Sequence, residues 1–407
     1  MERRKLLKNG FWAFVGLQMP LRPDFRIEDV PADTILTHQQ WLRGLNGASK
    51  ENAQFLSDSK SIYRDVANMQ RSGCDWIVPS SAYPEMYTRD AILNLFADLD
   101  PQYVENILAI FVNHQDSCGQ IQTSISKEGN VARYDDESTL LFLILAAKAV
   151  QIGINVDERS LNLAKEFLIS HISSDFSYQT LGQNTDNDRS TYHYWMDSLV
   201  LSNPASPTYV QGLASLALEC CQKLGLTVDQ RTIREVRKRY QACFATGPAL
   251  GLGSDIWDVS ALAPEALSLL LFDKPLLRSD SVLHAYREIA STASTTYPDG
   301  EFLGYKVLSK KGHYLAPEYF NPGPELNWVG SYQNGGSWLL WDSLAIYAAG
   351  RHGSMRAPTD MVARVKSDLR HSESPSNEFL LTTPNISSVV VNSRGNYGWN
   401  GLIASLI

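Results

Sequence analysis

Two alternations along a series of helical segments constrain the fold of this chain more than any other feature of its sequence. From about residue 52 onward, apolar residues recur at helical spacing in twelve segments, and strand-like alternation is scarce. The best strand candidates are 387–392 and 301–308. The expected helices span about residues 53–70, 90–98, 102–114, 138–152, 158–172, 207–224, 228–245, 259–272, 280–293, 336–350, 359–370 and 397–407.

The first alternation is one of polarity. Every second segment, such as STLLFLILAAKAVQIG (138–153) or SWLLWDSLAIYAAG (337–350), is apolar on nearly every face. The intervening segments, such as DQRTIREVRKRYQACFA (229–245), carry a charged face and a narrower apolar stripe. A helix that is apolar all round has to be buried, whereas an amphipathic helix suits an outer layer. The sequence therefore predicts an inner layer of helices inside an outer one.

The second alternation is one of loop length. Connections after the even-numbered segments are short, such as GINVD (153–157), whereas those after the odd-numbered segments are long, such as 173–206 and 294–335. If consecutive helices are antiparallel neighbours, all the long loops lie on one face. We therefore expect an all-α fold, an (α/α)6 barrel of six helical hairpins, with its functional site on the face of the long loops.

Composition excludes several classes of function. Hydrophobic residues make up 44% and charged residues 20% of the 407 residues, as in a soluble globular protein. The net charge of −8 leaves no basic excess for nucleic acid. The sequence predicts no metal site, because its five cysteines include no C-x-x-C pair and its eight histidines are scattered. It also lacks a phosphate-binding glycine loop, so we expect no cofactor.

The N-terminus precedes the expected barrel. Residues 1–22 join two arginines to a short apolar stretch, which resembles a twin-arginine export signal without a small-residue cleavage site. The alternative, which we favour, is a basic start to a cytoplasmic protein. We expect an N-terminal extension over 1–50, a catalytic domain over 51–407, and no membrane span in the rest of the chain.

The long loops hold much of the aromatic content and most of the loop carboxylates. A sugar pocket needs both, because the C–H faces of a sugar ring stack on aromatic rings while its hydroxyls need directional polar partners. These loop residues are Trp76, Tyr83, Tyr87, Tyr134, Asp135, Asp136, Tyr192, Tyr194, Trp195, Asp197, Trp257, Asp258, Tyr319, Trp328, Tyr332, Glu378, Tyr397 and Trp399.

Five short motifs stand in order at the mouths of the expected hairpins: YTRD (87–90), YWMDS (194–198), YQNGGSW (332–338), NEFL (377–380) and RGNYGWNG (394–401). Over about residues 75–407, the sequence resembles the six-hairpin glycosidases. It is most similar to glycoside hydrolase family 63 and its relatives among glucoamylases, debranching glucosidases and mannosyl- or glucosylglycerate hydrolases. The resemblance implies an inverting enzyme, with an acid before the sixth helix and a base before the twelfth.

Carried over, the resemblance makes Asp197 the general acid and Glu378 the general base. The physical reading agrees for Asp197, because burial among rings such as Trp195 raises the pKa of a carboxyl. Inversion requires a second carboxylate across the sugar, about 6.5–9.5 Å away. Asp197 as a turn residue and Glu378 as a solvated loop residue are the alternatives. Glu318 and Glu325 compete for the role of base.

The resemblance also implies a set of substrate-binding residues. Arg89 and Asp90 would hold the nonreducing sugar by charge-assisted hydrogen bonds, while Gln333, Asn334 and Trp338 would line the floor of the pocket. Tyr87, Trp195, Trp257, Tyr397 and Trp399 complete the set. Each residue also has a structural interpretation.

In that interpretation, Thr88 and Asp90 cap a helix and Trp338 packs in the core. Asp135 and Asp136 cap the helix that follows them, and Trp257 and Asp258 are equally open between the two roles.

The expected substrate is small, a disaccharide or small α-glucoside, because no appended sugar-binding module is evident. A glycerate glycoside would need a cation in the site to bind the carboxylate of the substrate. No Arg or Lys stands between Asp197 and Lys223, so Arg133, on another long loop, would have to supply that cation. Two other functions stay open. A sugar epimerase or polysaccharide lyase on the same barrel would use a base such as His193, and a noncatalytic carbohydrate-binding protein would keep only the aromatic residues.

Overall fold

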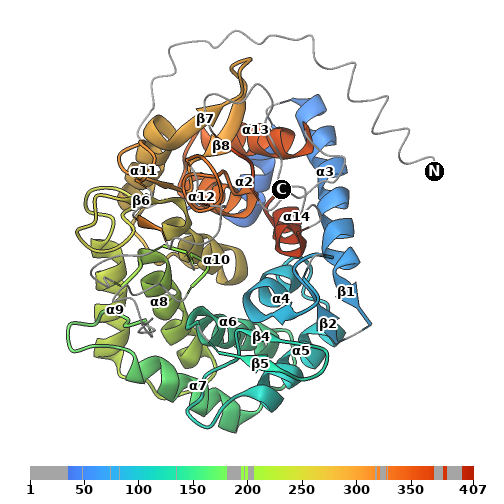
Figure 1. Ribbon diagram of the computed structural model, residues 1–407, viewed down its shortest axis with the longest axis vertical. Helices are drawn as coiled ribbons and strands as arrows, with labels where there is room; N and C mark the ends of the chain where they lie inside the picture. The colour runs from blue at the N-terminus through green and yellow to red at the C-terminus, as the bar shows by residue number, and fades with distance from the viewer. Residues whose placement is uncertain are drawn as a thin grey trace. The chain divides into compact units, whose positions relative to one another are not determined.

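All twelve segments predicted as helical are helical in the computed structural model of the chain (Figure 1). The structure describes residues 35–47, 49–73, 75–81, 83–133, 135–180, 194–196, 198–199, 206–316, 319–320, 327, 329–370, 379–382 and 397–407. The helices are α3 (Lys50–Met69), α4 (Thr88–Leu95), α5 (Pro101–His114), α6 (Glu137–Gln151), α7 (Glu158–Ser170), α8 (Thr208–Lys223), α9 (Gln230–Ala242), α10 (Ala263–Phe272), α11 (Ser279–Glu288), α12 (Leu339–Arg351), α13 (Ala357–Arg370) and α14 (Ile403–Leu406). Short helical turns extend three of them, namely η1 (Val259–Leu262) before α10, η2 (Ile289–Ala293) after α11 and η4 (Gly398–Leu402) before α14.

The helices form two concentric layers. Within the inner layer, α4 packs on α6, α6 on α8, α8 on α10, α10 on α12, α12 on α14, and η4 closes the ring against α4. Helices α3, α5, α7, α9, α11 and α13 surround this ring (Figure 1). The (α/α)6 barrel expected from the sequence is confirmed.

Burial follows the polarity of each sequence. Helix α6 buries nearly all of its residues, and α12 buries every residue from Leu339 to Arg351. Helix α9 buries only Ile233, Val236 and Tyr240, and its charged face is turned outward. Because an all-apolar helix loses stability on any exposed face, this difference sorts the helices into layers.

Short strands tie the long loops to one another. Strand β3 (Met86–Tyr87) pairs with β4 (Ser124–Ile125) of the next long loop, and β4 pairs with β5 (Val131–Ala132). Strand β6 (Trp257–Asp258) pairs in the same way with β9 (Leu308–Ser309). These pairings between successive long loops place them on one face, as the loop lengths predict.

Two further hairpins complete the strand content of the described residues. Strand β1 (Arg71–Ser72) pairs with β2 (Trp76–Ile77), and β7 (Ser294–Thr296) pairs with β8 (Phe302–Tyr305). The strand expected over 301–308 is therefore present as β8 and the start of β9. The candidate at 387–392 lies outside the described residues.

One helix was not expected from the sequence. Helix α2 (His38–Asn46) begins with a capping box, in which the Thr37 hydroxyl accepts from the Gln40 backbone while the Gln40 side chain accepts from the Thr37 backbone. It buries Trp41 and Leu45, and the Trp41 indole donates to the carbonyl of Leu406 at 2.7 Å. Helix α2 belongs to the compact unit Ala32–Ile407, although the sequence interpretation left it in the N-terminal extension.

The proposed division into residues 1–50 and 51–407 stays a prediction, and the export-like segment at 1–22 lies outside the described residues. Among the described helices, none combines the length and apolar character needed to span a bilayer.

Candidate functional site

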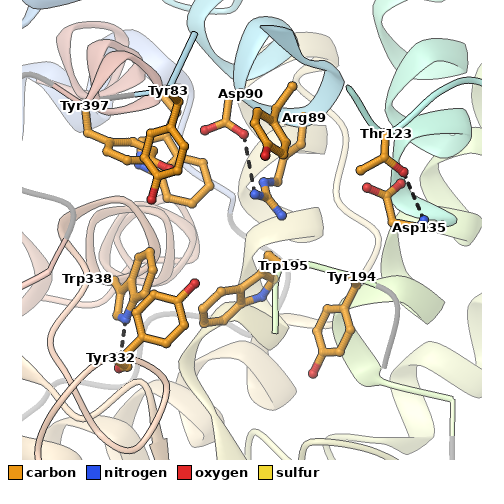
Figure 2. Close-up of a pocket in the computed structure, with 12 residues that line it drawn as sticks. Tyr83, Arg89, Asp90, Thr123, Asp135, Tyr194, Trp195, Tyr332, Trp338 and Tyr397 are labelled. Carbon is orange, nitrogen blue, oxygen red and sulfur yellow. Dashed lines mark hydrogen bonds and ion pairs between the residues drawn. The ribbon is translucent and has the colours of Figure 1, made fainter. Parts of the chain in front are cut away.

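A cavity of about 120 Å³ opens among the long loops. Its walls come from the residues before and at the start of α4, the loop before α6, the segment after residue 193, the turn before α12 and the turn before η4. In Figure 2 the side chains converge on one space. The lining residues are Tyr83, Tyr87, Arg89, Asp90, Thr123, Asp135, Tyr194, Trp195, Tyr332, Trp338, Tyr397 and Trp399.

Arg89 forms ion pairs with two acidic side chains at this wall. It lies in the first turn of α4, where its guanidinium binds Glu137 Oε1 at 2.7 Å and Asp90 Oδ2 at 3.4 Å. It also lies over the Trp399 ring, 5.1 Å from the ring centre. Burial alone would lower the pKa of Arg89, but the carboxylates of Glu137 and Asp90 outweigh it and hold that pKa well above its ordinary value.

The carboxyls around Arg89 hold their protons more tightly than exposed ones. Burial raises the pKa of Asp90 to about 6 and that of Glu137 to about 7, although Arg89 opposes both shifts. Asp90 Oδ1 is buried and has no hydrogen-bond partner among the described residues. Asp90 thus pairs with Arg89 through one oxygen, and its other oxygen is a buried acceptor without a hydrogen-bond partner among the described residues.

Aromatic rings pack against one another, edge to face or tilted, along the rest of the wall. The Trp338 ring lies 5.3 Å from that of Trp195, 6.0 Å from that of Trp399 and 5.2 Å from that of Tyr332, measured between ring centres. The Tyr397 ring lies 5.0 Å from that of Trp399. Because each ring is held by its neighbours, the wall is rigid and presents ring faces and edges to the cavity.

A buried hydrogen-bond chain holds Trp195. Its indole donates to Ser260 Oγ at 3.0 Å, and the Ser260 hydroxyl donates to Asp258 Oδ1 at 2.6 Å. Burial raises the pKa of Asp258 to about 7, against the opposing hydrogen bonds from Ser260. Asp258 therefore supports the wall from behind.

The structure brings most of the sequence-predicted binding residues to the cavity. The seven that line it are Tyr87, Arg89, Asp90, Trp195, Trp338, Tyr397 and Trp399. Their role in binding a sugar stays a prediction.

Three predicted binding residues are not among those that line the cavity. Trp257 is buried in strand β6 beneath Gly247. Asn334 binds the backbone of Leu315 and Asn327 through its side-chain amide, and Gln333 binds the backbone on either side of residue 197. Amides are short enough to satisfy buried backbone groups in a loop, and that use takes these two away from the cavity.

Sequence reasoning missed five residues of the lining and one behind it. Tyr83, Tyr194 and Tyr332 are expected from the sequence only as loop aromatic residues, and Asp135 only as a loop carboxylate that caps a helix; Thr123, a further lining residue, carries no local signal. Asp135 also accepts from the Ser138 backbone at 3.0 Å, so its expected capping role is confirmed, whereas Asp136 makes no such side-chain cap. Glu137, which binds Arg89, reads in sequence only as an acidic residue in a first helical turn.

The proposed acid and base, Asp197 and Glu378, lie outside the described residues, as do the competing Glu318 and Glu325. Their chain neighbours are described. Trp195 lines the cavity, and Phe379 stacks on Trp338 with ring centres 5.4 Å apart. Within the described part of the chain, no group of three or more His, Cys, Asp and Glu side chains could hold a metal ion.

No family model and no curated protein matches this sequence. Solved structures do. A wild-type glycosidase is 12% identical and aligns over 87% of this chain and 98% of its own, with a TM-score of 0.51. The GH63 mannosylglycerate hydrolase from Thermus thermophilus, in complex with Tris and D-glycerate, is 9% identical over 86% of this chain and 99% of its own, with a TM-score of 0.50. The same hydrolase in complex with glucose is 11% identical over 85% and 99%, with a TM-score of 0.50. At these identities the likeness shows the fold, and the chain has the six-hairpin barrel of these glycosidases.

Proposed function

We propose that the protein is a glycoside hydrolase, an inverting, exo-acting enzyme on a small α-glucoside or related glycoside. The observation that carries the proposal is the cavity wall, in which the ion-paired Asp90 keeps one carboxylate oxygen unpartnered among the described residues, beside a rigid row of indole and phenol rings. A sugar ring needs this combination, because its hydroxyls require directional acceptors and its C–H faces pack on rings.

The solved neighbours support the same class of substrate. They are glycosidases, and one of them was solved in complex with glucose. Because fold alone does not determine activity, the residues of the cavity carry the argument and the neighbours add to it.

Within this proposal Asp197 is the general acid and Glu378 the general base. What supports the pairing is the position of their chain neighbours, since Trp195 lines the cavity and Phe379 packs on Trp338, another lining residue. The two positions follow different hairpins, and the rings of Trp195 and Phe379 both pack against Trp338. Asp197 would protonate the leaving oxygen, and Glu378 would activate a water on the opposite face of the sugar.

The cavity favours a single, uncharged sugar unit. A single water needs about 10–15 Å³ of cavity volume. A cavity of about 120 Å³ therefore holds a monosaccharide ring rather than a long oligosaccharide. Arg89 is the one cation among the described lining residues, and Glu137 and Asp90 already neutralise it. An anionic aglycone such as glycerate therefore gains no free positive charge from these residues.

Product anomers measured by NMR on a panel of α-glucosides test the proposal. We expect hydrolysis with inversion, so that the β-anomer appears first. A retained anomer would contradict the mechanism, and an unsaturated or epimerised product would replace the hydrolase with a lyase or an epimerase. Binding without turnover across the panel would favour a noncatalytic sugar-binding protein.

Substitution of the two carboxyls tests their roles. Asp197→Asn and Glu378→Gln should each lower kcat by about three orders of magnitude, because each removes a proton transfer in the transition state. Glu301→Gln, on an exposed loop glutamate that pairs with Arg370, is the control and should keep wild-type turnover. Circular dichroism checks that all variants fold. Near-normal turnover in either active-site variant would refute the role given to that residue.

A further inference from the structure

We infer that Gln333 is a positioning residue, which fixes the backbone segment that carries the general acid, rather than a residue that binds the sugar. The inference rests on the proposed function, because it gives Gln333 a role through Asp197. It differs from the role that the family resemblance implies, which places Gln333 on the floor of the pocket.

The hydrogen bonds of Gln333 bracket position 197. Its amide Nε2 donates to the carbonyl of Trp195 at 2.9 Å. Its Oε1 accepts from the Ser198 backbone at 3.2 Å and from the Ser198 hydroxyl at 2.5 Å. One buried side chain thus binds the backbone before position 196 and after position 197, and both parts of its amide are used.

The turn that carries Gln333 is itself fixed. Tyr332 has a left-handed φ of 39°, which is strained for a residue with a side chain and persists only where the surroundings impose it. The Tyr332 carbonyl accepts from the Gly336 backbone and from the Trp338 indole, each at 3.1 Å. A Cβ at Gly336 would lie 2.5 Å from that same carbonyl oxygen, so only glycine allows this close turn. The strained turn directs the Tyr332 ring to the cavity and the Gln333 amide to the segment behind it.

The segment is also held from its other side. The Trp195 indole is fixed by Ser260 and Asp258, as described above. Trp195 is therefore bound by its side chain from one loop and by its backbone carbonyl from another. The described ends of this segment, Trp195 and Ser198, are therefore both anchored by buried hydrogen bonds. Support of this kind is what a general acid requires, because it has to reach the leaving oxygen within a fraction of an ångström.

The expected effect is on the chemical step. A misplacement of about 1 Å at a reacting group costs about 100-fold in rate. Gln333→Leu removes every hydrogen bond of the side chain and keeps its approximate volume. We expect kcat to fall about 100-fold and KM to stay within about threefold, because Gln333 is buried behind the cavity lining. A sugar-binding Gln333 would instead raise KM.

A second variant and a matched control separate positioning from general loss of structure. Ser198→Ala removes only the hydrogen bond of the hydroxyl and should lower kcat a few-fold. In the double variant it should cause little further loss of kcat beyond that of Gln333→Leu, because both substitutions act on the same contact. Gln211→Leu is the control. Gln211 is equally buried, accepts from the Tyr178 backbone at 2.8 Å and donates to the Val236 carbonyl at 3.1 Å, away from the cavity. Its loss should lower stability while leaving kcat of the folded fraction unchanged.

Hydrogen exchange gives a readout that does not depend on activity. The Ser198 amide is protected by Gln333, so in Gln333→Leu it should exchange at least tenfold faster, whereas in Gln211→Leu its rate should not change. The inference is overturned if the Ser198 amide exchanges at the wild-type rate, if KM rises while kcat holds, or if kcat stays within twofold of the Gln211→Leu value. A wild-type protein that hydrolyses no glycoside on the panel refutes the proposed function, and the exchange rates then decide alone whether Gln333 fixes this segment.

Discussion

Asp258 shows how a single buried carboxyl can shape both the site and the stability of the protein. It has no exposed surface, one oxygen takes both hydrogen bonds from Ser260, and the other has no hydrogen-bond partner among the described residues. Burial raises its pKa to about 7, whereas an Asp in an unfolded chain titrates near 3.9. The folded protein therefore keeps a proton that the unfolded chain releases.

This bound proton determines the direction in which the stability of the protein changes with pH. Between about pH 4 and pH 7 the folded state binds more protons than the unfolded state, so the free energy of unfolding falls as the pH rises. Asp258→Asn keeps the acceptor for Ser260 and removes the titration. Between pH 5 and pH 8 the free energy of unfolding of the wild-type protein should fall by about 2–3 kcal/mol more than that of the variant. Urea unfolding at the two pH values measures this difference. Asp255→Asn, at an exposed carboxylate of the same loop, should behave as the wild type, and equal losses in all three proteins would contradict the assignment.

Also at the scale of residues, the sequence predicted those cavity residues that stand together in short motifs. Arg89 and Asp90 stand together in YTRD, and Trp195 and Trp338 stand in similarly compact motifs. It could not separate Gln333 from the lining, because whether a buried amide faces a cavity or a backbone depends on a turn whose left-handed residue, Tyr332, is not a glycine. Glu137 was missed for a related reason, since its partner Arg89 lies on another helix.

At the scale of elements, a glycine decides how helix α2 docks. Gly350 in α12 faces Trp41, and a Cβ built on Gly350 would lie 2.0 Å from the Trp41 ring. The absence of a side chain therefore opens the groove that the indole fills. The same indole bonds to Leu406, so one contact joins α2, α12 and α14.

Gly350→Ala should therefore displace Trp41 and destabilise the protein by about 3 kcal/mol, as overpacking of a rigid core does. Gly44→Ala, on the opposite partner helix α2, is a matched control, because its new Cβ would meet nothing closer than Pro358 at 4.0 Å. The control should be neutral or stabilising by about 0.5–1 kcal/mol, since alanine favours helix. Chemical denaturation followed by tryptophan fluorescence measures both. A Gly350→Ala protein as stable as the wild type would mean that Trp41 does not pack in this groove.

Helix α2 also marks the limit of prediction for elements. The twelve helices of the barrel follow from apolar periodicity, because each of them has to bury a stripe or a whole surface. Helix α2 has only nine residues and buries two, so its periodic signal is weak. Its start was nevertheless readable, since Thr37 and Gln40 are spaced as a capping box requires.

For the whole molecule, helix α2 bears on where the folded unit begins. A protein that starts at residue 32 should unfold at the same temperature as the full chain, whereas one that starts at residue 51 should be destabilised by several kcal/mol. The second loses the burial of Trp41 and Leu45, each worth about 1.5–3 kcal/mol, and the contact of Arg351 with the Leu36 carbonyl. Thermal unfolding of the two proteins checks this. Equal stability would place the domain boundary at residue 50, as the sequence suggested.

The barrel as a whole was predictable because two independent patterns, polarity and loop length, agree on it. The cavity was predictable only as a location, the face of the long loops. Its walls combine Tyr83, Thr123, Trp195, Trp338 and Trp399, which come from most of the chain and meet only because the ring of inner helices closes. No local pattern reports which side chains a closed ring brings together.

The closure of the inner ring by η4 against α4 has a consequence for synthesis. A ribosome makes α4 early and η4 late, so the nascent chain carries α6, α8, α10 and α12 before the segment exists that completes their ring. Those helices are almost wholly buried in the finished barrel, and for most of translation their surfaces have no final partner. Apolar surface left exposed in this way favours aggregation, and any ligand site that needs all of these walls forms only after the segment carrying Trp399 has left the exit tunnel.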